Sequence, residues 1–359
     1  MNRRACLSLI AAALAVPAAA QEDLVVRQVS DPLHPLQQAW QTWKRMCLMS
    51  DGRIVDGFQE GASHSEGQGY GLVLAAMFAD HFSCRTIIDW TERHLAVRDD
   101  ALLSWRWRPN TVPQIEDPNN ASDGDIFYAW GLLLVSNLVG DESLRVRATR
   151  IARDLDRLCL IDLPDSSGDV VLLPAVNGFV REEGILINPS YYMPLAMTQI
   201  AAATGTQRLA QAASSGMALI DRLGEIGPVP DWVLVDGDSL TKPPDGFSSQ
   251  SGYEAVRVPL FALWSGHARS PAVLAHVKAT STFGSEATPT RIDPRTGEVS
   301  ERSGHAGYAA VSRLGECAAG GGVGSLMPRF NSDQPYYPAT LHLMSLLVQI
   351  TTYPRCVPL

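Results

Sequence analysis

Along the chain, a segment that is apolar on nearly every side is repeatedly followed by an amphipathic one. The apolar segment 70–82, YGLVLAAMFADHF, precedes 84–97, in which apolar and charged residues alternate. The same order recurs at three further places, namely 125–138 with 142–160, 190–204 with 206–223, and 252–268 with 270–283. A helix that is apolar all round is typical of a core, and an amphipathic one of a surface layer. The pattern therefore predicts pairs of one buried and one outer helix.

Further elements are predicted before, between and after these pairs. Leu36, Trp40, Trp43 and Cys47 share one helical face, and segment 338–353 is a closing helix. Between residues 164 and 188, the sequence DVVLLPAVNGFVREEGILIN predicts a short β-hairpin insertion. Alternating buried and outer helices favour an all-α fold, a closed α/α double ring or toroid, with an open α-solenoid as the alternative. Since no linker or shift in composition is visible, we expect residues 21–359 to form one domain.

Residues 1–20 have the pattern of a signal peptide. Arg3 and Arg4 precede an apolar run that is too short to span a bilayer, and small residues lead up to Gln21. No later stretch is apolar for long enough to be a membrane helix, so we expect a periplasmic or secreted protein, exported by a Sec or twin-arginine route. Residues 1–20 hold two arginines and no acidic residue, so their removal changes the formal net charge from −9 to −11. This charge argues against nucleic acid as a partner, whereas a neutral polymer would not be repelled.

The cysteines indicate little redox or metal chemistry. The five that follow the signal peptide are Cys47, Cys84, Cys159, Cys317 and Cys356. An export compartment permits disulfides, and an odd number leaves at least one thiol free or paired between chains. Because no C-x-x-C motif occurs, a thiolate zinc site is not expected. We expect buried thiols, with or without one bridge.

The sequence HSEGQGYG, residues 64–71, is compatible with a metal site, a phosphate loop or a catalytic acid. His64 and Glu66 match half of the zinc deaminase motif, but its P-C-x-x-C half is absent, as is H-E-x-x-H. The glycines follow G-x-G-x-G rather than the dinucleotide pattern G-x-G-x-x-G, and no P-loop lysine follows. A purely structural alternative is that Ser65 or Glu66 caps the next helix. Other carboxylates have to decide between a cap and a catalytic acid.

Acidic residues and tyrosines stand at the predicted start of four buried helices. They are Glu66, then Asp123 and Asp125, then Tyr191 and Tyr192, and finally Tyr253 and Glu254 with Arg257. In a double ring, the ends of alternate helices meet at one rim, so we expect these side chains to line one groove. Paired carboxylates among aromatic rings are what glycoside hydrolysis requires, because acids supply and remove protons while rings stack on sugars. One carboxyl must stay protonated, so its pKa must be raised.

Four motifs in order, SHSEGQGYG, NNASDGD, NPSYYMP and YEAVRVPLF, resemble those of glycoside hydrolase family 8. The likeness extends from about Trp40 to the C-terminal helix and is greatest to the bacterial cellulases encoded with cellulose synthase. It implies an (α/α)₆ barrel with an open cleft and inversion at the anomeric carbon. It also implies that Glu66 is the general acid, that Asp123 lies at the reacting sugar, and that Trp105 stacks on a glucose unit.

The fourth motif departs from the family at one position. The tyrosine and acid of that motif correspond to Tyr253 and Glu254, but the residue usual in the family at the second position is an aspartate acting as base. Glutamate is one methylene longer and can crowd the water that an inverting site holds between its carboxyls. Asp125, Tyr192, Trp232 and Arg257 are further expected substrate-binding residues in the cleft, and core packing is the alternative for the two tryptophans, Trp105 and Trp232.

The predicted function is an exported endo-β-1,4-glucanase that acts on cellulose or β-glucan beside bacterial cellulose synthesis. The alternatives are a related hydrolase acting on chitosan, mixed-linkage glucan or xylan, and a glucan-binding assembly factor whose hydrolysis is impaired by Glu254. No metal and no cofactor are expected. The expected partners are the glucan chain and, in function, a cellulose synthase complex, and the protein is expected to be a monomer.

Overall fold

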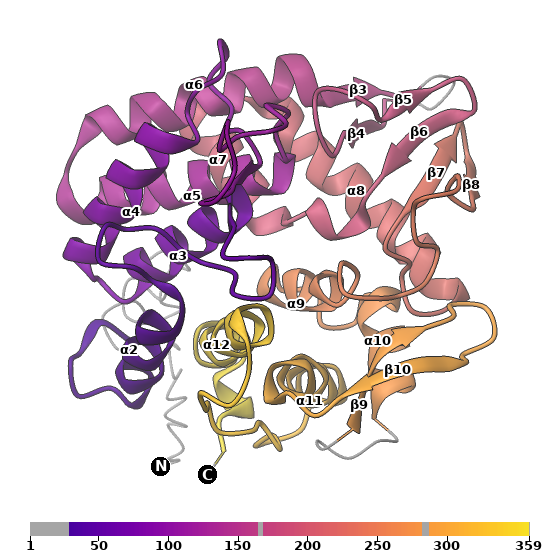
Figure 1. Cartoon of the computed structure of the whole chain (residues 1–359). Helices are drawn as coiled ribbons and strands as arrows, with labels where there is room; N and C mark the ends of the chain where they lie inside the picture. Colours follow the sequence, from indigo (N-terminus) through magenta and orange to yellow (C-terminus); the bar gives the residue numbers. More distant parts are fainter. Residues whose placement is uncertain (1–28, 164–167, 282–286, 359) are drawn as a thin grey trace, which may run out of the picture.

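The computed structural model describes residues 29–163, 168–281 and 287–358 (Figure 1). The predicted signal peptide, residues 1–20, lies outside the described residues. Within them, no helix combines the length and the apolar character that crossing a bilayer requires.

Two layers of helices build the described part of the chain. The inner layer consists of α3 (Ser65–Met77), α5 (Ser122–Val139), α7 (Pro194–Thr204), α9 (Arg257–Trp264), α11 (Ala306–Gly320) and α12 (Tyr336–Thr351). The outer layer consists of α2 (Pro35–Cys47), α4 (His81–His94), α6 (Glu142–Cys159), α8 (Gln207–Ile226) and α10 (Pro271–Thr280). This is the predicted (α/α)₆ barrel. The prediction of alternating buried and outer helices is confirmed from α2 to α11, after which α12 follows as a second consecutive inner helix.

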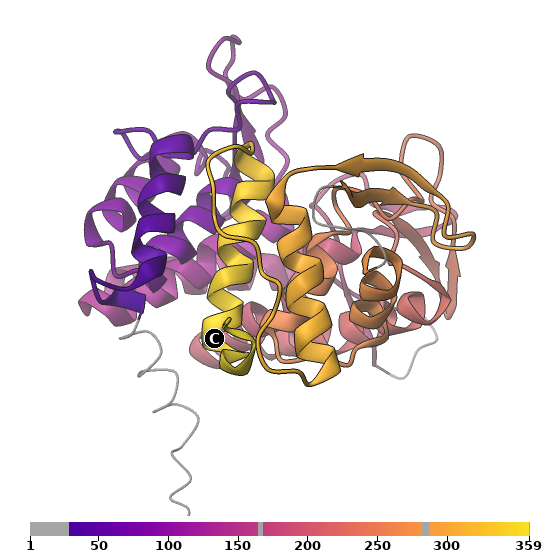
Figure 2. The ribbon, with the colours of Figure 1, turned by 90° about the horizontal axis from the view of Figure 1, so that it is seen from below.

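The ring closes where the last helix meets the first outer one. The Trp43 indole N–H of α2 donates to Thr340 Oγ1 of α12 at 2.9 Å, and the Trp43 ring lies 6.5 Å from that of Tyr336. Helices α11 and α12 run side by side, with strands crossing near one of their ends (Figure 2). Because the chain returns to its own start, the alternative of an open α-solenoid is wrong.

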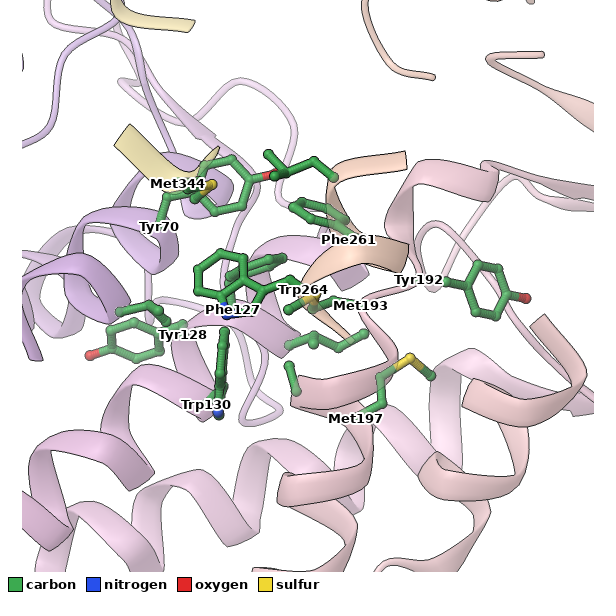
Figure 3. Packing of buried hydrophobic residues seen from close by; sticks show 14 of the residues in the cluster. Tyr70, Phe127, Tyr128, Trp130, Tyr192, Met193, Met197, Phe261, Trp264 and Met344 are labelled. Atoms are coloured by element: carbon green, nitrogen blue, oxygen red, sulfur yellow. The ribbon is translucent and has the colours of Figure 1, made fainter. Parts of the chain in front are cut away.

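The inner helices pack closely because glycines and aromatic rings alternate at their contacts. A Cβ on Gly69 would lie 2.8 Å from the Phe127 Cβ, so α3 and α5 can approach this closely only with glycine there. Beside this contact, the Tyr70 ring meets Phe127 edge-on at 4.6 Å, and Phe127 lies 5.1 Å from Phe261 of α9. Figure 3 shows these rings among the buried residues of the core. The core thus fixes the first turns of α3, α5 and α9 relative to one another.

An extended segment without a helix, residues 321–335, follows α11 and runs back along α12. Its Ser325 accepts from Gln349 at 2.6 Å, and its Pro328 carbonyl lies 3.0 Å from His342 Nε2. Cys317 of α11 forms a disulfide with Cys356, at the end of the short 3₁₀ helix Pro354–Cys356. The other three described cysteines are buried free thiols, as expected.

Short strands lie outside the barrel. β5 (Val180–Arg181) and β6 (Gly184–Ile187) form the predicted hairpin, but they belong to a four-stranded antiparallel sheet with β7 (Val233–Asp236) and β8 (Ser239–Thr241). Three further antiparallel pairs are β1 (Ser63–His64) with β2 (Arg106–Trp107), β3 (Leu160–Asp162) with β4 (Val170–Leu172), and β9 (Thr288–Ile292) with β10 (Val299–Ser303). The prediction of a single small insertion was therefore incomplete.

Some predicted boundaries also differ from the structure. Helix α3 begins at Ser65 rather than 70, and α7 and α9 begin at Pro194 and Arg257, later than expected. A turn and a 3₁₀ helix, Pro189–Tyr191, occupy the residues before α9 and α7. Helix α11 was not predicted.

Candidate active site

One cleft of about 670 Å³ opens where the N-terminal ends of the inner helices converge. Each inner helix, or the short segment before it, contributes to the lining: Glu66 of α3, Asp123 of α5, Tyr191 before α7, Arg257 of α9, Tyr308 of α11 and Tyr336 of α12. The expectation that the buried helices begin at a shared rim agrees with this arrangement. Helix N-termini favour negative charge, which suits a site built from carboxylates.

The buried guanidinium of Arg257 joins three carboxylates. Its Nη1 lies 2.7 Å from Glu66 Oε2 and 2.9 Å from Asp123 Oδ2, and its Nη2 pairs with Glu254 Oε2. Nη1 also donates to the Tyr70 hydroxyl at 3.0 Å, and Nη2 to Ser190 Oγ at 2.7 Å. A single positive charge thus faces three acids, so the cluster favours retention of a proton on at least one of them.

Glu66 is the acid that the surroundings favour as the proton carrier. Its side chain keeps 25 % of its surface exposed, yet burial raises its pKa to about 8. The charge of Arg257 opposes this shift, whereas Asp123 and Glu254 add to it. Arg257 contacts Oε2, so Oε1 can carry the proton. Glu66 therefore holds a proton at neutral pH, which is the state that a general acid needs.

Helix α3 positions Glu66 through an anchor two residues further along the helix. Buried Gln68 accepts from the Ile54 backbone N–H at 2.6 Å and donates to Thr91 Oγ1 at 2.9 Å. Glu66 itself lies in the first turn, where the N-cap residue His64 makes no side-chain capping bond. The interpretation of Glu66 or Ser65 as a simple helix cap therefore does not describe this helix, because the Glu66 carboxylate binds Arg257.

Asp123 lies next to Glu66 because α3 and α5 touch at their first turns. A Cβ on Gly124 would be 2.2 Å from Ser65 Oγ, so only glycine permits this approach. Asp123 Oδ1 accepts from the Gly124 N–H at 2.8 Å, while Oδ2 binds Arg257. Burial raises the pKa of Asp123, and Arg257 opposes the rise.

Glu254 occupies a turn before α9 rather than a helix. Its carboxylate accepts from Asn188 Nδ2 at 3.2 Å in addition to Arg257, and 40 % of its side chain is exposed. The turn is held from behind by buried Asp231, whose Oδ1 accepts from the backbone N–H groups of Gly252 at 2.9 Å and Ala255 at 2.8 Å. Glu254 is therefore open to water while its backbone is fixed.

Aromatic residues line the cleft together with the acids. The Trp105 ring is stacked at 5.9 Å on His64 and has the Arg106 guanidinium 4.3 Å from its centroid. Tyr253 lines the cleft and donates its hydroxyl proton to Glu301, while the Tyr191 ring lies 5.6 Å from the Arg257 guanidinium. Such rings offer flat faces to sugar units.

The structure places three other predicted cleft residues differently. Asp125 is 0 % exposed and accepts from the Leu103 N–H at 2.8 Å and from Asn120 Nδ2 at 2.9 Å, outside the cleft lining. Tyr192 is 1 % exposed, and its hydroxyl accepts from the Leu172 N–H at 2.8 Å. Figure 3 shows it apart from the other labelled rings. Both side chains hold backbone segments, and the neighbouring residues Asp123 and Tyr191 line the cleft instead.

Trp232 does not line the cleft directly. It is half-buried in a cluster with Phe179, stacked at 5.8 Å, and Phe247 at 4.9 Å, and it lies 6.3 Å from the Tyr191 ring. The core-packing alternative thus describes Trp232 better than a direct stacking role, and Trp232 supports Tyr191 from the side.

Several lining residues were not among the predicted site residues. They are His64, Glu301, Tyr308, Tyr336 and Tyr337. Burial lowers the pKa of His64 to about 4, so its ring is neutral. The Tyr337 hydroxyl donates to the Tyr253 carbonyl at 2.5 Å and so ties α12 to the Glu254 turn. The pair of tyrosines at the start of the closing helix was a visible signal for this role, by analogy with the other helix starts.

Within the described ranges, no group of three or more His, Cys, Asp or Glu side chains has an arrangement that could hold a metal ion. Glu66, Asp123 and Glu254 converge on Arg257 instead.

Comparison with known proteins gives a consistent result. The model for glycosyl hydrolases family 8 matches residues 3–351. A probable endoglucanase of Novacetimonas hansenii is 32 % identical over 311 residues, covering 86 % of this chain and 89 % of that protein. An endoglucanase of Cellulomonas uda is 30 % identical and covers 77 % of each. Among solved structures, the endo-β-1,4-glucanase of Acetobacter xylinum has a TM-score of 0.77 at 29 % identity, covering 91 % of this chain and 98 % of that one.

Proposed function

The chain belongs to glycosyl hydrolases family 8, and on this basis we propose that it is an endo-β-1,4-glucanase that cleaves cellulose or β-glucan chains with inversion of configuration. The observation that carries the proposal is the cluster of Glu66, Asp123 and Glu254 around Arg257 in a cleft with aromatic walls. It supplies one protonated and one water-accessible carboxyl, the pair that inversion requires.

Glu66 is the general acid in this proposal. Its protonated carboxyl donates to the glycosidic oxygen as the bond to the anomeric carbon breaks, which lets the leaving chain depart as a neutral alcohol. Arg257 then stabilises the carboxylate that Glu66 becomes, because their contact at 2.7 Å is already formed. Proton donation therefore requires no rearrangement of the guanidinium.

Glu254 is the general base. It accepts a proton from a water molecule that attacks the anomeric carbon from the face opposite the leaving group, so the product has the α configuration. The exposure of Glu254 admits that water, and Asn188 and Arg257 orient the carboxylate. Asp231 fixes the turn from which this side chain extends.

Asp123 and the aromatic residues position the sugar. Asp123 binds a hydroxyl of the reacting glucosyl unit with its carboxylate, while Trp105 and Tyr253 stack on or contact neighbouring units. Tyr191 completes the wall beside Arg257.

Release of reducing ends from carboxymethyl cellulose, measured beside chitosan, mixed-linkage glucan and xylan, tests the substrate. A clear preference for the β-1,4-glucan is expected. Preference for chitosan or xylan would contradict it, and absence of hydrolysis with retained binding would favour an assembly factor.

Two further measurements test the mechanism. NMR of the product in the first minutes of the reaction should show α-configured ends, and early β-product would contradict inversion. Activity should persist in EDTA, and loss of activity in EDTA would contradict the metal-free mechanism.

The setting of the enzyme is also part of the proposal. Residues 1–20 act as a signal peptide, residues 21–359 form one catalytic domain, and the exported monomer acts beside a cellulose synthase complex. The first point is supported by the pattern of residues 1–20 and the last by the likeness to cellulases encoded with such synthases. N-terminal sequencing of the mature protein should begin at Gln21, and light scattering should give the monomer mass.

A further inference from the structure

Phe58 is an aromatic side chain that lines the cleft yet leaves 80 % of its surface in water. A single exposed apolar residue is ordinary on a protein surface. This one, however, stands at the mouth of a cleft that already carries Trp105, Tyr191 and Tyr253. Its exposed ring therefore lies at the same cleft as the aromatic residues of the proposed active site.

The loop that carries Phe58 is held in one shape by its own hydrogen bonds. Asp56 Oδ1 accepts from the Phe58 N–H at 2.9 Å, and Oδ2 accepts from Gln59 Nε2 at 3.0 Å. The backbone of Asp56 donates to Ala62 at 2.9 Å and closes the loop, with Glu60 in the left-handed region at φ 57°. None of these bonds uses the Phe58 ring, so the loop presents the ring without needing it for its own shape.

The same loop is joined to the segment that carries Trp105. Arg108 forms ion pairs with Glu60 of the loop and, at 2.8 Å, with Glu116. The end of the loop continues into β1, which pairs with β2 at His64 and Arg106. Trp105 directly precedes β2, and its indole N–H donates to Asp117 at 3.0 Å. Phe58 and Trp105 thus lie on segments that are fixed to each other.

We propose that Phe58 forms an outer sugar-binding subsite of the cleft, in which its ring stacks on a glucosyl unit of a β-glucan chain beyond the unit bound by Trp105. The proposal rests on the proposed function. Gln59 lines the cleft next to Phe58, and since its amide nitrogen is used by Asp56, its carbonyl oxygen can accept from a sugar hydroxyl. Preorganisation of the loop reduces the entropy lost on binding.

Phe58→Ala should affect long substrates more than short ones. For a soluble β-1,4-glucan and for cellohexaose, KM should rise roughly 3- to 10-fold, as expected for loss of one stacking contact, while kcat changes little. For cellotriose, which on this proposal ends before the outer subsite, kcat/KM should change much less. Phe58→Trp keeps an aromatic face and should restore the KM for long chains.

Phe82→Ala is the matched control. Phe82 is also an exposed phenylalanine, at 64 %, but it lies on outer helix α4 and outside the cleft lining. It should leave KM for all lengths unchanged. Binding of cellohexaose to Glu66→Gln and to the Glu66→Gln, Phe58→Ala double variant, measured by calorimetry, checks the same contact without turnover.

The outcomes separate the two proposals. If the unmodified enzyme cleaves β-1,4-glucan but Phe58→Ala has the same KM as Phe82→Ala at every chain length, the subsite is contradicted and the proposed function stands. If the unmodified enzyme neither cleaves nor binds the glucan, the proposed function itself fails. Thermal unfolding of Phe58→Ala should match the unmodified protein, and a marked loss of stability would contradict the independence of the loop from the ring.

Discussion

The two carboxylates that share the Arg257 guanidinium with Asp123 are supported in opposite ways. Glu66 is the second residue of α3, a helix of 13 residues that packs on α5 and is anchored by buried Gln68. Glu254 lies on a turn, and its support is the Asp231 carboxylate bound to two backbone N–H groups. The position of Glu66 is therefore fixed by the core of the barrel, and the position of Glu254 by a local hydrogen-bonded turn.

The difference matches what each group has to do. An acid that is protonated at neutral pH needs burial, which a helix start inside the barrel provides. A base has to meet a water molecule, so it needs an exposed position with its direction fixed from behind. The position of Glu254 therefore depends on the two hydrogen bonds to Asp231 rather than on the packing of the barrel core.

Among the substitutions at Glu66 and at the Glu254 turn, Glu66→Gln should lower kcat the most. An amide cannot donate the proton, so kcat should fall by about 10²–10⁴-fold or more, the usual share of acid–base catalysis. The fold and the affinity for cello-oligosaccharides should be retained, because Gln keeps the shape and can still contact Arg257. Steady-state kinetics and calorimetry measure these two quantities. A variant that kept more than about a tenth of the rate would exclude Glu66 as the acid.

Glu254→Gln should also abolish turnover, and azide should distinguish the base from its neighbours. A small anion should recover activity in Glu254→Ala and give a glycosyl azide as product. Glu254→Asp should lower kcat by up to about 10²-fold, because the shorter side chain leaves the carboxylate roughly 1 Å too far from the water. If Glu254→Gln stays active while Asp123→Asn or Asp245→Asn is inactive and rescued by azide, the base lies there instead.

Asp231→Ala should impair catalysis by Glu254 without affecting Glu66. Loss of both backbone hydrogen bonds lets the turn shift, and a displacement of Glu254 of about 1 Å can lower kcat by up to about 10²-fold with little change in KM. Asp231→Asn keeps Oδ1 as an acceptor and should recover most of the rate. A fall in stability without a change in kcat for Asp231→Ala, or equal losses for Ala and Asn, would show that Asp231 does not act through Glu254.

The helix pairs and the helix starts of the cleft could be predicted because both rest on strong local patterns. Helix α11 could not: its sequence AGYAAVSRLGECAAG is rich in small residues, so its apolar face is weak, and its burial comes from α9, α10 and α12. Glu301 lies on β10 and Tyr308 on α11. Because neither element was predicted, these two cleft residues were not predicted either. The extended segment 321–335 likewise has no periodic pattern of apolar residues from which it could be predicted.

The sequence also cannot show which of two nearby residues in a motif faces the cleft. Successive residues of an α-helix are rotated by about 100°, so Asp123 and Asp125 point in directions about 200° apart. The motif identifies both acids, but only the packing of α3 against α5 decides that Asp123 faces the cleft. Tyr191 and Tyr192 present the same ambiguity, since the side chains of neighbouring residues in an irregular segment diverge.

The smallest expected effect is on stability, and it follows from the protonation of the buried acid. Folding raises the pKa of Glu66 from 4.5 to about 8, so the folded state binds a proton more tightly than the unfolded state. The corresponding stability is fully present below pH 4.5 and is lost as the pH rises through about 8. Glu66→Gln carries no such proton, so its Tm relative to the unmodified protein should increase by a few degrees between pH 5 and pH 9.

Thermal unfolding at both pH values measures this, with Glu225→Gln on the exposed face of α8 as control. A Tm difference for Glu66→Gln that does not change with pH would mean that Glu66 is ionised in the folded protein, and the division of roles between the helix-borne acid and the turn-borne base would then have to be reversed.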